Sequence, residues 1–236
     1  MQQLPLQLVP RGDFSFDNYV EGSNSLAVNL LKQMAQPASS RSVSEVQLYL
    51  WAEQGLGKSH LLQAACQMAA RHDCATSYLP LSELLATGPG ILDGLEQLEL
   101  VCLDELEVVA GRLDWEEGLF TLINRMRAAH KYLVFAARLA PNDLSLALPD
   151  FRSRLSWGPV FQLQPLGDSE KIQALKQRAM HRGVVLPDNA AEYLLRHYPR
   201  DLSGLFQRMD QLEEASLSFQ RRMTIPFIKS VLGHGI

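Results

Sequence analysis

The ten residues WAEQGLGKSH, at positions 51–60, form the strongest structural signal in this chain. They follow the apolar run VQLYL and lead into LLQAACQMAARH, whose apolar residues recur at helical spacing. Gly55 and Gly57 allow a tight turn between a strand and a helix, and Lys58 and Ser59 stand where that helix begins. Such a loop turns its backbone N–H groups, and the positive end of the helix, toward phosphate. The stretch therefore predicts a phosphate-binding P-loop.

Each residue of this loop has an expected role. The Lys58 ammonium would reach the β- and γ-phosphates of a nucleotide, and the Ser59 hydroxyl would be a ligand of Mg²⁺. The loop departs from the GxxxxGK[ST] pattern at Ala52, where the first glycine is expected. A glycine-rich turn that binds nothing is the alternative interpretation of this stretch alone. The predicted nucleotide-binding residues of the loop are Gln54, Gly55, Leu56, Gly57, Lys58, Ser59 and His60.

A second motif ends the apolar stretch LVCLDE. Asp104 and Glu105 stand where a Walker B strand places one carboxylate near Mg²⁺ and another near the attacking water. Two acids at the end of a strand can also be solubilising residues, but together with the upstream P-loop they indicate a nucleotide site. We therefore predict that Asp104 contacts the nucleotide and Mg²⁺, and that Glu105 is catalytic.

The remaining chain reads as alternating strands and helices, followed by helices alone. Apolar strands are expected at ATSYLP, KYLVFAA and PVFQLQPL. Among them lie the helical stretches WEEGLFTLINRMRAAH and LSELLATGPGILDGLEQL, the latter interrupted at Gly88-Pro89-Gly90. This alternation indicates a parallel sheet with helices on both faces. The fold class is thus α/β, a P-loop core followed by a small all-helical lid domain. The expected parts are a flexible tail (1–13), an α/β nucleotide-binding domain (14–166) and the lid domain (167–236).

Composition and charge argue against several classes of function. The 236 residues carry a net charge of -4, which gives no electrostatic case for strong non-specific DNA binding. No stretch approaches the roughly 20 apolar residues of a membrane span, so no membrane partner is expected. Cys66, Cys74 and Cys102 lack metal-type spacing, which is typical of a reduced cytosolic protein and predicts a cytoplasmic location. The absence of HExxH and GxSxG leaves metal and serine hydrolases without support.

The chain opens with MQQLPLQLVP, which is broken by prolines and lacks the basic start of a signal peptide. Gln3, Leu4, Leu6 and Leu8 follow a Q-L-x-L-x-L order. An extended peptide of this kind can place the glutamine amide in a polar subsite and the leucines in an apolar pocket of a partner. A frayed terminus without a partner is the alternative.

Several motifs together resemble the DnaA/Hda family of AAA+ proteins, over residues 14–236. FSFDNYVEGSNSLA, with Tyr19 and Val20, resembles the family segment that packs beside the base and ribose, and GLGKSHLLQAAC resembles its Walker A helix. DFRSRLSWG resembles box VII, in which Arg154 matches the arginine finger that points into a neighbouring subunit's nucleotide. YPRDLSGLFQRMDQL resembles the sensor 2 helix, with Arg200 in the arginine's place. A structural salt bridge is the alternative role of Arg154.

The helix-turn-helix domain and the long N-terminal domain of DnaA are not seen in this sequence, so the resemblance is to the Hda-type members, the regulatory inactivators of DnaA. In these members the N-terminal peptide binds the β sliding clamp of DNA polymerase III. The resemblance implies ADP or ATP with Mg²⁺ as cofactor, a diphosphate above all. It also implies three partners: the clamp through the tail, DnaA through Arg154, and DNA indirectly through the clamp. Homo-oligomers through AAA+ contacts are compatible with it.

The function expected from this resemblance is stimulation of the hydrolysis of DnaA-bound ATP, by a clamp-tethered, bacterial negative regulator of replication initiation. The strand YLVFAARLAP lacks the usual polar sensor 1 residue, because Ala136 and Ala137 are inert and only Arg138 is polar. Hydrolysis by the chain's own site is therefore expected to be weak. The alternatives are a DnaA-like adaptor that loads other replication proteins, and a self-sufficient AAA+ ATPase, which would need an intact sensor 1.

Overall fold

The computed structural model of the chain describes residues 14–37, 45–219 and 221–233. These residues form two compact units. The first unit holds residues 14–16, 24–37 and 45–164, and the second holds residues 17–23, 165–219 and 221–233. The predicted clamp-binding residues Gln3, Leu4, Leu6 and Leu8 lie outside the described residues.

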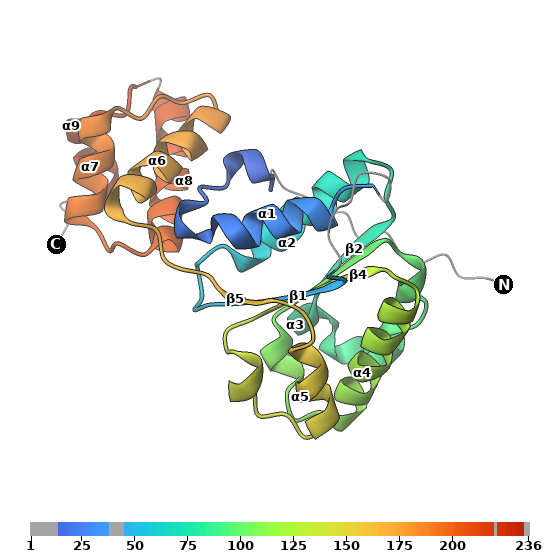
Figure 1. Cartoon of the computed structure of the whole chain (residues 1–236). Helices are drawn as coiled ribbons and strands as arrows, with labels where there is room; N and C mark the ends of the chain where they lie inside the picture. The colour runs from blue at the N-terminus through green and yellow to red at the C-terminus, as the bar shows by residue number, and fades with distance from the viewer. Residues whose placement is uncertain (1–13, 38–44, 220, 234–236) are drawn as a thin grey trace. The chain divides into compact units, whose positions relative to one another are not determined.

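The first unit is built on a five-stranded sheet in the order β2-β3-β4-β1-β5, in which all neighbouring strands are parallel (Figure 1). The strands are β1 (Gln47–Trp51), β2 (Thr76–Pro80), β3 (Leu100–Asp104), β4 (Tyr132–Ala137) and β5 (Val160–Gln162). β3 and β4 are buried along their whole length, which explains why their sequences are continuously apolar rather than alternating.

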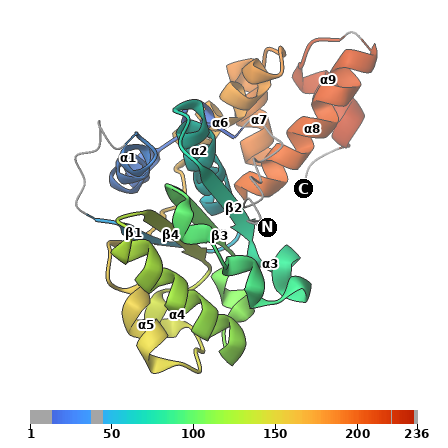
Figure 2. The ribbon, with the colours of Figure 1, turned by 90° about the vertical axis from the view of Figure 1, so that its right-hand side faces the viewer.

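Helices cover both faces of this sheet, as the sequence predicts. The helices of the first unit are α1 (Ser25–Met34), α2 (Lys58–Arg71), α3 (Leu81–Leu84), α4 (Leu113–Ala128) and α5 (Pro149–Leu155). Figure 2 shows α1 and α2 on one face of the sheet and α4 and α5 on the other. The core between α4, α5 and the sheet includes the fully buried rings of Trp115, Phe135 and Phe151. The predicted α/β class is confirmed.

The helical region between β2 and β3 is broken at Gly88, within the predicted interruption, and it is divided further on both sides of that break. α3 has only four residues, and short 3-10 turns follow at Leu85–Thr87, Pro89–Leu92 and Leu95–Gln97. Gly88 and Gly94 take positive φ angles of 77° and 84° between these turns. Residues other than glycine rarely adopt such angles, so Gly88 can end the turn before it and Gly94 can precede the turn at Leu95.

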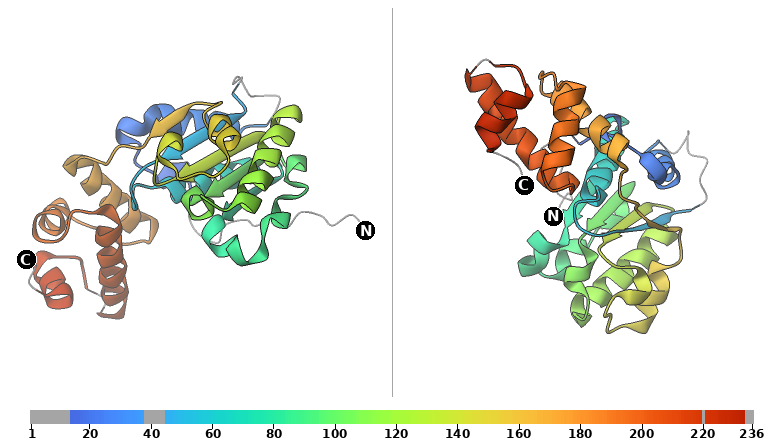
Figure 3. Two further views of the ribbon diagram at one scale, coloured as in Figure 1. Left: turned by 90° about the horizontal axis from the view of Figure 1, so that it is seen from below. Right: turned by 90° about the vertical axis from the view of Figure 1, so that its left-hand side faces the viewer.

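The second unit is a set of four helices with its own core (Figure 3). The helices are α6 (Asp168–His181), α7 (Asp188–His197), α8 (Leu202–Phe219) and α9 (Ile225–Leu232). Leu194, Met209 and Ile228 are fully buried in this core. The Thr224 hydroxyl accepts from the Phe227 N–H and caps α9, as expected of a threonine before a helix. The expected helical lid domain is confirmed.

The border between the units differs in detail from the expected domain limits. It falls between Gln164 and Pro165, and residues 17–23 belong to the second unit. Gln177 Nε2 donates a hydrogen bond to the Asp17 carbonyl, which attaches this segment to α6. Within the described residues, no helix is both long enough and apolar enough to cross a bilayer.

Candidate functional site

The loop between β1 and α2 has the backbone of a phosphate cradle. Gly55 and Gly57 have positive φ angles of 83° and 86°, and Gly57 is the N-cap of α2. The Leu61 N–H bonds to the Gly57 carbonyl at 3.0 Å, which is the first helical bond of α2. The N–H groups of Lys58 and Ser59, the first two residues of α2, therefore have no acceptor within the helix. Amides at the positive end of a helix form an anion-binding arrangement.

Lys58 is held inside this loop. Its side chain is nearly buried, and its ammonium donates to the carbonyl oxygens of Ala52 at 2.5 Å and Glu53 at 2.8 Å. Burial lowers the pKa of Lys58, and the negative charges of Asp104 and Glu107 oppose this shift. The cation thus lies within the loop, at the start of α2 and near the carboxylates of Asp104 and Glu107.

Ala52 occupies the first position of the P-loop pattern without backbone strain. Its N–H bonds to the Ala137 carbonyl at 3.2 Å, which continues the pairing of β1 with β4. Among the non-glycine residues that the structure describes, positive φ angles occur at Asp73, Glu105 and His130 and not at Ala52. The freedom of glycine is therefore not required at this position.

Asp104 ends β3 and is buried beside Tyr78. The Tyr78 hydroxyl donates to Asp104 Oδ2 at 2.8 Å, and the Glu105 N–H donates to Oδ1 at 2.9 Å. Burial and the Asp104 charge raise the pKa of Tyr78, while a hydrogen bond with Ser59 opposes this shift. Tyr78 therefore remains a protonated donor that links Asp104 and Ser59, the two predicted Mg²⁺ ligands.

This pair of oxygen donors suits Mg²⁺, which commonly takes one or two ligands from the protein and the others from water and phosphates. The described part of the chain contains no cluster of three or more His, Cys, Asp or Glu residues that could hold a metal on its own. Ser59 and Asp104 fit a cation that arrives with a nucleotide.

Glu105 follows Asp104 in a left-handed conformation, with φ 59° and ψ 44°. This region costs a residue with a side chain about 1–2 kcal/mol, and such strain is concentrated at functional sites. The Ser82 hydroxyl donates to the Glu105 carboxylate. The predicted catalytic carboxylate is thus fixed just beyond the end of β3.

The residue after β4 is engaged by an acid that the sequence did not single out. Arg138 Nε lies 3.0 Å from Glu107 Oε1, and the Arg138 N–H donates to Glu107 Oε2 at 3.1 Å. Glu107 was missed although it stands in the same acidic run, DELE, as the predicted site residues. The position expected for sensor 1 is therefore filled by an ion pair.

The other predicted nucleotide residues are distributed over the two units. His60 Nε2 lies 2.9 Å from the Ser15 carbonyl and its ring packs edge-on against Phe14, both in the first unit. Tyr19, Val20 and Arg200 belong to the second unit, where Arg200 pairs with Asp168 at 3.4 Å. Their contribution to a nucleotide site stays a prediction.

Arg154, in α5, stacks on aromatic side chains rather than on an acid. Its guanidinium carbon lies 3.5 Å from the centroid of the Trp157 ring and 5.4 Å from that of Phe120. It forms no ion pair with any residue that the structure describes. The salt-bridge alternative therefore has no support among those residues.

The main chain around Arg154 lies at the amino end of β1. Gln47 Nε2 donates to the carbonyls of Arg154 at 2.8 Å and Leu155 at 3.1 Å. Gln47 is the first residue of β1, whereas the P-loop follows Trp51, the last. Arg154 and the P-loop are thus attached to opposite ends of the same strand.

Two family models match this chain. Residues 168–232 match the Hda lid domain, and residues 11–86 match the bacterial DnaA ATPase domain.

Solved structures share the fold. Domain III of the Thermotoga maritima replication initiation protein DnaA superposes with a TM-score of 0.79 at 19% identity, covering 94% of this chain and 96% of that one. AMPPCP-bound DnaA from Aquifex aeolicus superposes with a TM-score of 0.73 at 17% identity, covering 90% of this chain and 68% of that one. The Thermotoga maritima RuvB Holliday junction branch migration motor superposes with a TM-score of 0.61 at 17% identity, covering 95% of this chain and 72% of that one. These likenesses show the shared fold, an α/β unit with a parallel sheet followed by a helical unit.

Proposed function

Because the chain belongs to the DnaA/Hda family of AAA+ replication-initiation regulators, we propose that it stimulates the hydrolysis of ATP bound to DnaA. In this proposal the N-terminal peptide with Gln3, Leu4, Leu6 and Leu8 tethers the chain to the β sliding clamp on DNA. Arg154 then enters the nucleotide site of DnaA. Hydrolysis inactivates DnaA and so prevents re-initiation in the bacterial cytoplasm.

The placement of Arg154 carries this proposal. Its main chain is bonded to Gln47 at the start of β1, whereas the chain's own P-loop follows the end of that strand. Its guanidinium has no counter-charge among the described residues. An arginine so placed is suited to a nucleotide on a neighbouring molecule rather than to its own.

The chemistry of such an arginine is charge stabilisation. Negative charge spreads over the phosphate oxygens in the transition state of hydrolysis. A guanidinium supplied in trans stabilises this charge and raises the hydrolysis rate by roughly 10³–10⁵-fold. Arginine remains charged at all relevant pH values and presents a planar fork of donors. Arg154 therefore needs no activation by a base; it needs only to be brought to the phosphates.

The chain's own site is proposed to hold ADP or ATP with Mg²⁺ as a structural ligand. The amides of Lys58 and Ser59 and the Lys58 ammonium would hold the phosphates, and Ser59 and Asp104 would hold Mg²⁺. The bound ion would neutralise phosphate charge. The AMPPCP in the Aquifex aeolicus DnaA structure supports the choice of an adenine nucleotide. The Arg138–Glu107 ion pair at the sensor 1 position supports slow turnover at this site.

The test is hydrolysis of radiolabelled ATP pre-bound to DnaA, in the presence of this chain, clamp and DNA, with each omitted in turn. We expect fast hydrolysis only in the complete mixture. ATP turnover by this chain alone at the same rate would identify a self-sufficient ATPase. Recruitment of other replication proteins without any stimulated hydrolysis would identify a loading adaptor.

A further inference from the structure

Two arginines share one indole ring on the first unit. The guanidinium carbons of Arg127 and Arg154 lie 4.3 Å and 3.5 Å from the centroid of the Trp157 ring. Neither guanidinium forms an ion pair or a hydrogen bond with any residue that the structure describes. Two like charges near one ring repel each other, and arginine cannot lose its proton to relieve the repulsion. An anion near this pair would offset that repulsion.

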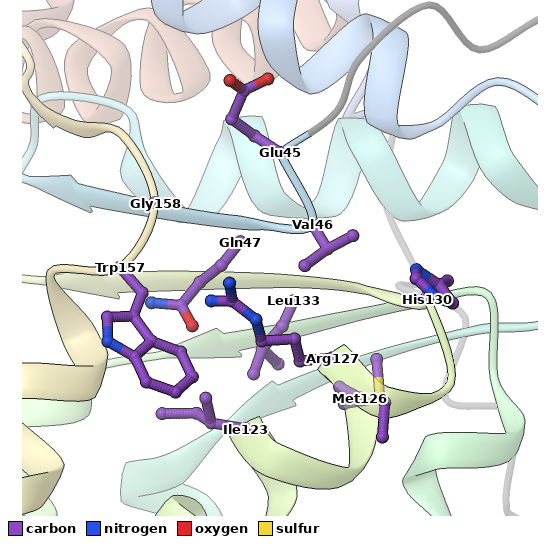
Figure 4. Close-up of a pocket in the computed structure, with 11 residues that line it drawn as sticks. Glu45, Val46, Gln47, Ile123, Met126, Arg127, His130, Leu133, Trp157 and Gly158 are labelled. Carbon is purple, nitrogen blue, oxygen red and sulfur yellow. The ribbon is translucent and has the colours of Figure 1, made fainter.

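The indole is also a wall of a pocket of about 490 Å³, shown in Figure 4. Apolar side chains supply much of its lining, among them Val46, Ile123, Met126 and Leu133. Figure 4 shows that the Glu45 side chain, although it lines the pocket, points away from Arg127 and Trp157. A concave apolar surface beside an uncompensated guanidinium suits a segment that carries an apolar residue and a carboxylate.

Close packing holds this surface in shape. A Cβ atom at Gly158 would lie 2.0 Å from the Gln47 carbonyl oxygen, so only glycine permits this approach. The Gln47 side-chain amide also holds the end of α5. The backbone N–H of Trp157 donates a hydrogen bond to the Arg154 carbonyl at 3.1 Å. At the start of α5, the Leu148 N–H donates to the buried carboxylate of Glu116 at 2.6 Å. A surface held in this way loses little conformational entropy on binding.

We infer that Arg127 anchors an acidic segment of the same DnaA molecule whose ATP receives Arg154. This inference rests on the proposed function. In the complex Arg154 leaves the indole to reach the phosphates, and Arg127 stays on Trp157 and binds a DnaA carboxylate. The apolar neighbour of that carboxylate fills the pocket. DnaA is the occupant because the pocket adjoins Arg154 through Trp157, and because the uncompensated positive charge complements an acid. Arg127 thus contributes to the affinity for DnaA, and Arg154 raises the rate of hydrolysis of the ATP bound to DnaA.

The experiment separates these two roles. With the full chain, clamp, DNA and ATP-loaded DnaA, we measure the Kd of the complex and the single-turnover hydrolysis rate at saturation. Arg127→Gln should raise the Kd by about 10- to 100-fold, the range of a lost charge-assisted hydrogen bond, and leave the saturated rate unchanged. Arg154→Ala should lower the saturated rate with little change in Kd.

Arg125→Gln is the matched control, because it removes the same charge from the same helix. Arg125 forms an exposed ion pair with Asp93 at 3.6 Å and does not line the pocket. It should leave both the Kd and the rate unchanged. Arg127→Glu should raise the Kd further than Arg127→Gln, since it repels a carboxylate. Arg127 is exposed, so its variants should keep the wild-type melting temperature.

Four outcomes would overturn the inference. The first is an unchanged Kd for Arg127→Gln, and the second is an equal rise in Kd for Arg125→Gln. The third is the same Kd for Arg127→Gln and Arg127→Glu, and the fourth is a lower saturated hydrolysis rate for Arg127→Gln. Failure of the proposed function is a different result: Arg154→Ala would then support hydrolysis as well as the wild type, whatever Arg127 does to the Kd.

Discussion

Replacement of Arg154 by alanine should destroy stimulation of DnaA while leaving the chain folded. A finger that contributes roughly 10³–10⁵-fold in rate corresponds to about 4–7 kcal/mol of transition-state stabilisation. The contacts that the side chain makes within its own protein are far weaker. They comprise its stacking on Trp157 and on Phe120, with no ion pair among the described residues.

The loss of folding stability should therefore be small. Cation–π contacts of a partly exposed arginine are worth about 0.5–2 kcal/mol. In a chain of this size each kcal/mol shifts Tm by about 2–4 °C, so Arg154→Ala should lower Tm by a few degrees. The Gln47 bonds to the carbonyls of Arg154 and Leu155 involve only the main chain of α5 and should survive.

Two measurements on one protein decide between a functional and a structural arginine. Differential scanning calorimetry gives the Tm, and single-turnover hydrolysis of DnaA-bound ATP gives the rate. Arg154→Lys should rescue poorly, because an ammonium lacks the planar fork of the guanidinium. A stable Arg154→Ala protein that stimulates hydrolysis fully would refute the reasoning. A large fall in Tm with normal activity per folded molecule would assign Arg154 a structural role.

Three further outcomes are expected. Lys58→Ala should abolish the rise in Tm caused by ADP, since the charge-assisted bonds to phosphate are lost; an unchanged shift would contradict the P-loop assignment. Changing Gln3 and Leu4 to alanine should abolish co-elution with the clamp in gel filtration but leave the ADP response, whereas persisting co-elution would mean that the tail is not the tether. Burial raises the pKa of Glu213 in the folded protein, so the ionised carboxylate lowers the free energy of unfolding at neutral pH. This cost disappears as the pH falls below the ordinary pKa of a glutamate, where the carboxyl is protonated in both the folded and the unfolded chain. Glu213→Gln should therefore raise Tm at about pH 7 and not at about pH 4; a lower Tm at neutral pH would show that its ion pair with Arg182 at 3.0 Å dominates.

The fold could be predicted from the sequence because its signals are local. Continuous apolar runs such as KYLVFAA can be buried on both faces only in a covered parallel sheet. Gly55 and Gly57 have the positive φ angles that a loop of this type requires. Asp104 ends its strand, as the pattern LVCLDE predicts.

Residues that reach the site through strand pairing could not be predicted in the same way. Tyr78 contacts Asp104 because β2 pairs with β3, with Tyr78 opposite Cys102. Nothing near Tyr78 in the sequence specifies this neighbour. The same holds for Trp157 and Arg127, which are thirty positions apart and meet only because α4 packs against α5. Side-chain stacking of this kind is a property of the packed unit, not of either segment.

The two departures from the motor pattern have different physical consequences. Ala52 is buried, pairs with Ala137 and needs no glycine-like angle, so this change does not disturb the loop that would hold phosphate. At the sensor 1 position, by contrast, Arg138 is bound to Glu107, whose charge also acts on Lys58. A polar residue that responds to the γ-phosphate must be free to contact it, and a side chain held by a carboxylate must first break that ion pair. The phosphate-binding loop thus keeps its expected conformation, whereas the sensor 1 position, which serves turnover, is altered. This contrast supports the proposal that the nucleotide is a structural ligand of this chain and that Arg154 acts on the nucleotide of another molecule.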